Sequence, residues 1–140
     1  MKIKILYLLL IINCIFIISC NKQNDYEMPE FDVYFCPKDD CENAIYNFIN
    51  ETNKEIKCAF FELNLEKIIN LFKEKNNIDI ELLIDHRYEK YVKDLDFVQI
   101  INRSGLMHNK YCIRDNEYIL TGSTNPTYNC VNRNNNNLII

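Results

Sequence analysis

Four side chains toward the end of the sequence have the chemistry needed to act on a phosphate group. His108 is a potential nucleophile, and Lys110 places a cation two residues further along the chain. Ser123 and Asn125 add neutral hydrogen-bonding groups next to Gly122, which permits a close approach of the backbone. A nucleophile, a fixed cation and neutral donors can together transfer a phosphoryl group without a metal.

A hairpin is expected to carry these side chains. Apolar and polar residues alternate over 106–113, so a strand there would place His108 and Lys110 on one face. Asp115-Asn116 predicts a tight turn, and residues 117–121 would form the returning strand that leads into Gly122. The hairpin therefore predicts that the phosphate-binding groups meet at one end of the two strands.

The preceding part of the chain has the alternation of strands and helices that is typical of an α/β fold. Short runs rich in apolar residues alternate with helical apolar stripes, and we therefore expect a mixed β-sheet flanked by helices in a domain over 31–140. The expected strands cover 31–35, 57–61, 78–84 and 97–101, and the expected helices cover about 41–52 and 65–74.

A resemblance to a known family supports this interpretation. The phospholipase D superfamily has the signature HxKxxxxD followed by GSxN, and this chain matches it with His108-Asn109-Lys110 through Asp115 and then Gly122-Ser123-Thr124-Asn125. The segments 34–39 and 82–85 are also similar to the family, so that the resemblance covers about residues 31–140. It implies a phospholipase D-like fold.

The resemblance also implies a mechanism. His108 would attack phosphorus and form a phosphohistidine intermediate, which water would then resolve, with no metal and no cofactor. Lys110 and Asn125 would hold the phosphate oxygens, and Ser123 would support their loop. Asp115 is carried over with the catalytic motif, in a role that is more structural than chemical.

The family uses two motifs for each active site, whereas this chain has one. The resemblance therefore implies a homodimer with one shared site on the two-fold axis, to which each subunit contributes His108.

One position departs from the family pattern. Where relatives often carry an acidic residue that orients the imidazole, this chain has Asn136, and an amide stabilises a charged ring less than a carboxylate does. The sequence also ends in the apolar run 138–140, which resembles the opening of a strand, so a C-terminally truncated domain is expected. An inactive membrane-anchored binding module is the corresponding alternative function.

The first twenty residues are typical of an export signal. Lys2 and Lys4 precede an apolar run over 5–18, which is shorter than the roughly 20 residues that a spanning helix needs. Ile17-Ile18-Ser19-Cys20 resembles the lipobox of bacterial lipoproteins, in which the cysteine is lipidated. The sequence thus predicts a signal peptide over 1–20, a polar spacer over 21–30 and an envelope protein anchored to the membrane through Cys20.

Five cysteines remain in the expected mature chain, an odd number for an exported protein. They allow at most two disulfides within one chain, and the pairing cannot be deduced from the sequence. Cys58 and Cys112 lie in strand-like runs, where buried thiols are the expected state. The remaining three are Cys36, Cys41 and Cys130.

Composition limits the substrates. The chain has 140 residues, of which 48% are hydrophobic and 26% charged, as in one globular domain. Without residues 1–20, which hold two lysines and no acid, its formal charge is −6. That charge and the expected tether favour phospholipid headgroups over polynucleotides. The resemblance instead favours a dimeric endonuclease that cleaves DNA or RNA, because single-motif members of the family with this compact size are often nucleases.

Overall fold

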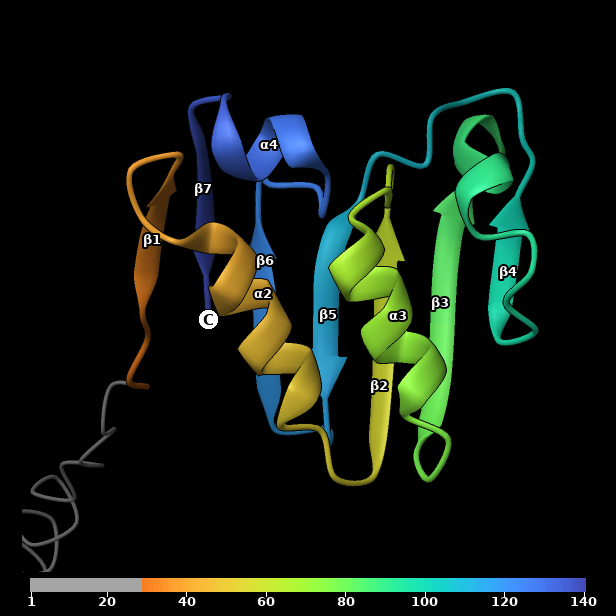
Figure 1. Ribbon diagram of the computed structural model, residues 1–140, viewed down its shortest axis with the longest axis horizontal. Coiled ribbons are helices and arrows are strands. Elements are labelled where there is room, and N and C mark those ends of the chain that lie inside the picture. The colour runs from red at the N-terminus through yellow and green to blue at the C-terminus, as the bar shows by residue number, and fades with distance from the viewer. Residues whose placement is uncertain (1–28) are drawn as a thin grey trace, which may run out of the picture. The chain divides into compact units, whose positions relative to one another are not determined.

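Strands and helices alternate along residues 29–140, the part of the chain that the computed structural model describes (Figure 1). The expected signal peptide, Cys20 and most of the expected spacer lie outside the described residues. Within residues 29–140, no helix has the length and apolar content that crossing a bilayer requires. The elements are β1 (Val33–Cys36), α2 (Cys41–Asn50), β2 (Glu55–Phe60), α3 (Glu66–Glu74), β3 (Asp79–Asp85), the 3-10 helix η1 (His86–Tyr91), β4 (Val98–Ile101), β5 (Lys110–Arg114), β6 (Tyr118–Gly122), α4 (Tyr128–Asn132) and β7 (Asn136–Ile139).

All the described strands form one mixed sheet of seven, in the order β1-β7-β6-β5-β2-β3-β4. β2, β3 and β4 run parallel, whereas the pairs on the other side of β2 are antiparallel. The expected α/β fold with a mixed sheet is confirmed. The crossover helix α3 joins two parallel neighbours, as a βαβ unit requires.

The two long helices form where capping and apolar spacing predict them. The Asp40 carboxylate accepts a hydrogen bond from the N–H of Asn43 (3.2 Å) and so caps α2. Four residues of its apolar stripe are buried: Ala44, Ile45, Phe48 and Ile49. α2 ends at Asn50, two residues before the expected end, and α3 starts one residue later than expected.

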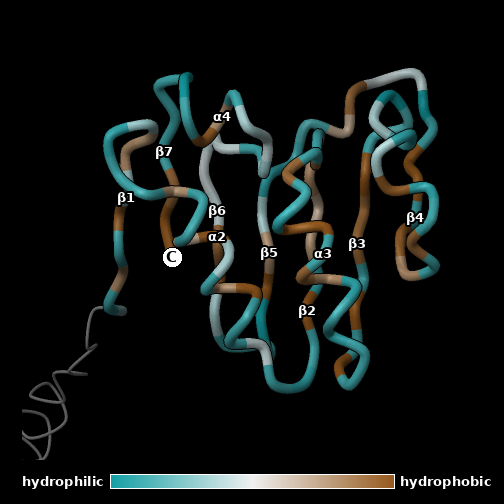
Figure 2. Tube along the Cα trace, in the orientation of Figure 1, coloured by the Kyte–Doolittle hydropathy of each residue, from teal (hydrophilic) through white to brown (hydrophobic). Residues whose placement is uncertain are grey.

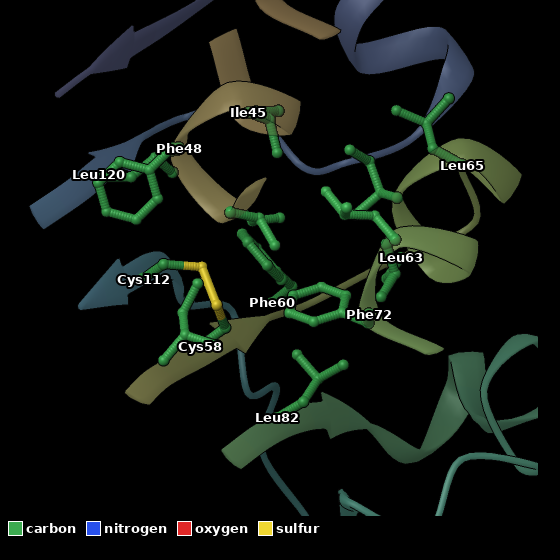
Figure 3. Close-up of a cluster of buried hydrophobic side chains, with 14 of the residues drawn as sticks. Ile45, Phe48, Cys58, Phe60, Leu63, Leu65, Phe72, Leu82, Cys112 and Leu120 are labelled. Atoms are coloured by element: carbon green, nitrogen blue, oxygen red, sulfur yellow. A yellow bond between two sulfur atoms is a disulfide. The ribbon is translucent and has the colours of Figure 1, made fainter. Parts of the chain in front are cut away.

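The hydrophobic core lies between one face of the sheet and the helices α2 and α3, which both lie in front of the strands in Figure 1. Ile45 of α2 and Phe72 of α3 are buried against Phe60 and Leu82 of the central strands (Figure 3). Hydrophobic residues are concentrated along strands such as β3 and β4, whereas most connecting loops are hydrophilic (Figure 2).

Two disulfides correct the expectation for the cysteines. Cys58 on β2 faces Cys112 on β5, and the two are bonded with their Cα atoms 4.1 Å apart (Figure 3). The expectation of free buried thiols at these positions is therefore wrong, because β2 pairs with β5 and brings the two cysteines opposite each other. Cys36 is bonded to Cys41, and Cys130 is the unpaired cysteine among the described residues.

The expected hairpin forms, but its first strand is shorter than expected. β5 begins at Lys110, so that His108 lies in the connection before it and not on the strand. The strand pairing with β2 ends at Phe60 and Lys110, and a single further backbone bond joins the N–H of Phe61 to the carbonyl of Asn109. The tight turn is present, with positive φ angles at Asp115 (53°) and Asn116 (58°).

Candidate active site

Four of the five predicted motif residues lie at the end of the sheet where the parallel strands β2 and β3 terminate (Figure 1). β5 starts at this end with Lys110, and β6 arrives there with Gly122 before the chain turns into α4 and β7. Of the predicted residues, His108, Lys110, Ser123 and Asn125 belong to this end. The carboxyl edge of parallel strands is where α/β proteins place their sites.

Backbone contacts on both sides hold the segment of His108. The N–H of Met107 donates to the Asp85 carboxylate at the end of β3 (3.0 Å), and the carbonyl of Asn109 accepts from the N–H of Phe61 (2.9 Å). The side chain of His108 is exposed, and its ring lies edge-to-face against Phe61 with the ring centroids 4.8 Å apart. The predicted nucleophile is thus fixed at its backbone although it precedes the strand.

Asp85 is an unusually buried carboxylate, with 0% exposure. Burial by itself raises the pKa of such a group, but the N–H groups of Met107 and Arg87 and the charge of Arg87 outweigh it and hold the pKa below its ordinary value. Asp85 therefore stays ionised while it anchors the residue before His108.

Lys110 supplies the cation of the site from the first position of β5. Its ammonium donates to the carbonyl of His108 (2.9 Å) and lies 5.4 Å from the centroid of the Phe61 ring. Partial burial lowers the pKa of this ammonium from its ordinary value, an effect that the nearby Cys130 opposes. A half-buried cation of this kind attracts an anion more strongly than a solvated one.

Asn125 is buried, with 6% exposure, and its amide has a defined orientation. The side-chain carbonyl accepts a hydrogen bond from the N–H of Glu62, just beyond β2 (3.3 Å). The amide nitrogen has Cys130 Sγ as a distant partner at 4.0 Å. The N–H₂ group therefore retains donor capacity that a phosphate oxygen could use.

Ser123 holds the loop between β6 and β7. Its hydroxyl donates to the side-chain oxygen of Asn136 (3.1 Å) and accepts from the N–H of Asn137 (2.9 Å). The amide nitrogen of Asn136 donates to the carbonyl of Cys130 (3.1 Å), so both ends of this amide are bonded within the loop. Gly122 is required here, because its φ is +148° and a Cβ would lie 2.3 Å from the carbonyl oxygen of Asn137.

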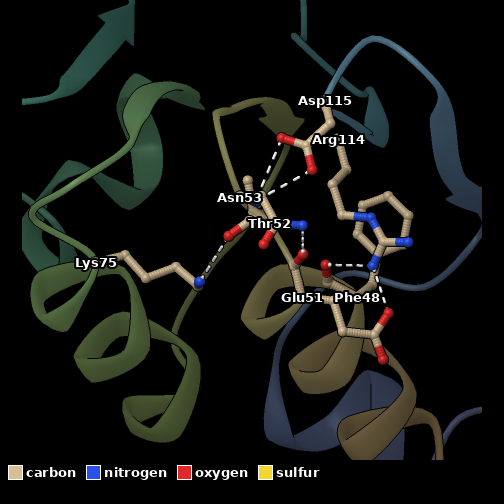
Figure 4. Close-up of polar contacts among 7 residues, drawn as sticks. All are labelled: Phe48, Glu51, Thr52, Asn53, Lys75, Arg114 and Asp115. Atoms are coloured by element: carbon tan, nitrogen blue, oxygen red, sulfur yellow. Dashed lines mark hydrogen bonds and ion pairs between the residues drawn. The ribbon is translucent and has the colours of Figure 1, made fainter.

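Asp115, in contrast, lies at the opposite end of β5, after Arg114 (Figure 1). Its carboxylate accepts from the N–H groups of Asn53 (3.1 Å), Lys54 (2.8 Å) and Glu55 (3.1 Å), as Figure 4 shows in part. These bonds outweigh the effect of burial and hold its pKa below the ordinary value. The structure does not bring Asp115 together with His108.

Two contact residues of the site could not be recognised from the motif. Asp85 ends a segment that the sequence marks as similar to the family, and its position after a buried strand is the one signal that points to it. Phe61 is the last residue of the strand expected over 57–61, and no feature of the sequence marks it as part of the site. Both act through contacts between segments far apart in the chain.

An open pocket of about 480 Å³ adjoins the motif loop. It is lined on one side by Ser123 and Asn136 and on the other by Phe35 of β1 and Lys38, which follows β1. Residues 29–140 contain no group of three His, Cys, Asp or Glu side chains placed to hold a metal ion.

Comparisons with known proteins agree with this arrangement. The family model described as cardiolipin synthase, PLD-like domain, matches residues 45–140. No curated protein matches the chain.

Several solved structures share the fold. Nuc from Salmonella typhimurium, a phospholipase D family member, has a TM-score of 0.71 and 18% identity over 80% of this chain and 82% of its own. NucT from Helicobacter pylori has a TM-score of 0.66 and 16% identity over 79% of this chain and 83% of its own. TrmBL2, an archaeal chromatin protein, matches at a TM-score of 0.53 and 14% identity, over 86% of this chain and 48% of its own.

Proposed function

Because this chain belongs to the phospholipase D-like domain family, we propose that it hydrolyses phosphodiesters with His108 as the nucleophile and without a metal or cofactor. The supporting observation is that Phe61-Glu62, at the end of β2, contacts His108, Lys110 and Asn125 at once. The nucleophile, the cation and the amide donor are therefore fixed around one short segment.

In the proposed reaction, Nε2 or Nδ1 of His108 attacks phosphorus, a P–N bond forms and the P–O bond to the leaving group breaks. The leaving oxygen takes a proton from a second imidazolium. The second imidazole, now neutral, then takes a proton from a water molecule whose oxygen attacks phosphorus. The P–N bond breaks, and the phosphomonoester and free His108 are released. Lys110 and the Asn125 amide bind the non-bridging oxygens, where negative charge is concentrated in the transition state.

The second imidazole would come from the partner subunit of a homodimer. The sheet face opposite α2 and α3 supports such an assembly, because apolar side chains on it are exposed: Val33 by 41%, Phe35 by 60% and Ile119 by 54%. The pairing register places these residues on that face, together with Ile113, which lies directly beside Ile119. An apolar surface of this kind is typical of an interface between subunits.

Phospholipid headgroups are the proposed substrate. The formal charge of −6 beyond residue 20 repels polynucleotides, and a lipid anchor at Cys20, itself part of this proposal, would hold the site close to lipid phosphodiesters. Nucleic acid is the second candidate. The chain matches Nuc, a phospholipase D family member, over about four fifths of both chains, so the two have about the same size. The family resemblance implies that single-motif members of this size often cleave nucleic acid.

The activity is tested with the full chain purified in detergent, with bis-p-nitrophenyl phosphate as substrate and EDTA present. We expect turnover by the wild type, loss of about 10³-fold or more in the His108→Ala variant, and unchanged turnover in a Lys73→Ala control, since Lys73 is an exposed residue of α3. Vesicles and single-stranded DNA then distinguish the two substrates. A folded dimer without turnover would contradict the proposal and favour an inactive binding module.

The proposed dimer is tested by sedimentation. The Ile119→Arg variant should be monomeric and inactive but folded, whereas Asn50→Arg, on the exposed side of α2, should remain dimeric and active. Full activity from a monomeric Ile119→Arg protein would overturn the proposal that two subunits share one active site.

A further inference from the structure

One aromatic side chain, Phe61, contacts both His108 and Lys110 of the motif. The ring of Phe61 lies edge-to-face to His108, with centroids 4.8 Å apart and the ring planes inclined at 65°. The ammonium of Lys110 lies 5.4 Å from the centroid of the same ring. On another side, Tyr88 packs edge-on against Phe61 with centroids 4.9 Å apart, and so fixes the ring in its place.

The imidazole of His108 has few other restraints. It precedes β5, so strand geometry does not orient it, and within residues 29–140 its ring makes no hydrogen bond. Asn136, which occupies the position of the family's acidic residue, bonds to Ser123 and Cys130 instead. Without a fixed neighbour, an exposed side chain exchanges among its staggered rotamers.

Phe61 has the properties that such a neighbour needs. An aromatic ring prefers the edge-to-face arrangement with another ring, and its face attracts a cation electrostatically. The two contacts therefore favour one relative placement of imidazole and ammonium. The backbone N–H of Phe61, bonded to the carbonyl of Asn109, ties the ring to the residue between His108 and Lys110.

We propose that Phe61 is a positioning residue, whose ring holds the His108 imidazole and the Lys110 ammonium in the arrangement that in-line attack requires. This inference rests on the proposed phosphodiesterase function. In this chain the aromatic contact takes over the orienting task that a carboxylate at position 136 would perform. Removing the ring should lower the rate of the chemical step more than substrate binding.

The kinetic test compares variants of the full chain, with bis-p-nitrophenyl phosphate as substrate. Phe61→Leu should lower kcat by roughly tenfold or more with little change in KM, and Phe61→Tyr, which keeps the ring, should restore most of the rate. The matched control is Phe97→Leu, because Phe97 is also half-buried but its ring packs against Phe72, 6.2 Å away, and not against the site.

The second readout is spectroscopic and does not depend on turnover. The chain contains two histidines, so the imidazole region of an NMR spectrum has one signal from His108 and one from His86. The ring current of Phe61 should displace the His108 signal in the wild type and in Phe61→Tyr. In Phe61→Leu that displacement should disappear, while the His86 signal stays unchanged.

The outcomes separate this inference from the function it rests on. Absence of turnover in the wild type refutes the function, whereas the His108 signal still reports whether Phe61 holds the ring. A Phe61→Leu variant with unchanged kcat and an unchanged His108 signal overturns the positioning role. Phe61→Met, which keeps an unbranched apolar side chain of similar volume, decides the question where the leucine variant does not fold.

Discussion

The buried carboxylate of Asp85 accepts a hydrogen bond from the backbone N–H of Met107 at 3.0 Å. This bond joins the end of β3 to the residue immediately before His108, over a sequence separation of 22 residues. It explains how His108, the proposed nucleophile, has a defined place outside the regular strands, and it makes Asp85 a residue on which the proposed activity should depend.

We expect Asp85→Ala to lower activity by roughly 10²-fold, because the backbone before His108 loses its anchor and the imidazole is displaced. The unpaired N–H of Met107 should also cost about 1–3 kcal/mol of unfolding free energy. Asp79→Ala is the matched control, since Asp79 is exposed and starts the same strand. Equal activities of the two variants, measured at a temperature where both are folded, would contradict the anchoring role.

Asp115 should matter for stability and not for chemistry. Its folded pKa lies below the ordinary value of 3.8, so the stabilisation it provides is complete above that pH and is lost as the pH falls through the folded pKa. The wild type should therefore be clearly more thermally stable than Asp115→Asn at pH 7, and this difference should become small as the pH falls below 3.8. A loss of turnover in a fully folded Asp115→Asn protein would instead assign it a chemical role.

The lowered pKa of Lys110 predicts the alkaline limit of activity. Since burial favours the neutral amine, kcat/KM should begin to fall at a pH below 10.5, the ordinary value of a lysine, as the ammonium loses its proton. Lys110→Arg keeps its charge at every accessible pH, so its slower reaction should lack this fall. An identical alkaline limb in both proteins would show that another group titrates.

The disulfide between Cys58 and Cys112 should be the more stabilising of the two. It closes a loop with a sequence separation of 54 residues, against 5 for Cys36 and Cys41. Chain entropy gives about 4 kcal/mol for the longer loop and about 2 kcal/mol for the shorter one. Denaturant titration of the two double alanine variants measures both, and a larger loss from the Cys36→Ala/Cys41→Ala protein would contradict this order.

Local sequence signals were sufficient for much of the fold. The apolar stripe of α2 and its Asp40 cap, the alternation of strands with helices and the turn at Asp115-Asn116 all depend on neighbours in the chain, and the structure contains them. The four candidate site residues at the end of the sheet could be predicted because their spacing in the sequence is itself the motif. Their common location at one end of the sheet follows from the hairpin.

Contacts between distant segments could not be predicted in this way. The bond between Cys58 and Cys112 depends on β5 pairing with β2, which is not its neighbour in the sequence. The contact of Phe61 with His108 depends on the same pairing. β5 begins only at Lys110 and leaves His108 outside the strand, next to Met107, whose N–H is bonded to Asp85 at the end of β3.

The pairing of β1 with β7 constrains the order in which the protein can fold. Val33 pairs with Ile139, so the first strand, β1, pairs with the last one, β7. The backbone groups of β1 and β6 that face β7 therefore remain unpaired until β7 has been synthesised. A chain that emerges from a ribosome or a translocation channel can form α2, β2, α3 and β3 early, because these contacts are local. The edge formed by β1 closes after synthesis of residues 136–139, and long-range pairing of this kind is slow. Until then β1 remains an unpaired strand with apolar side chains exposed, a state that is prone to aggregation.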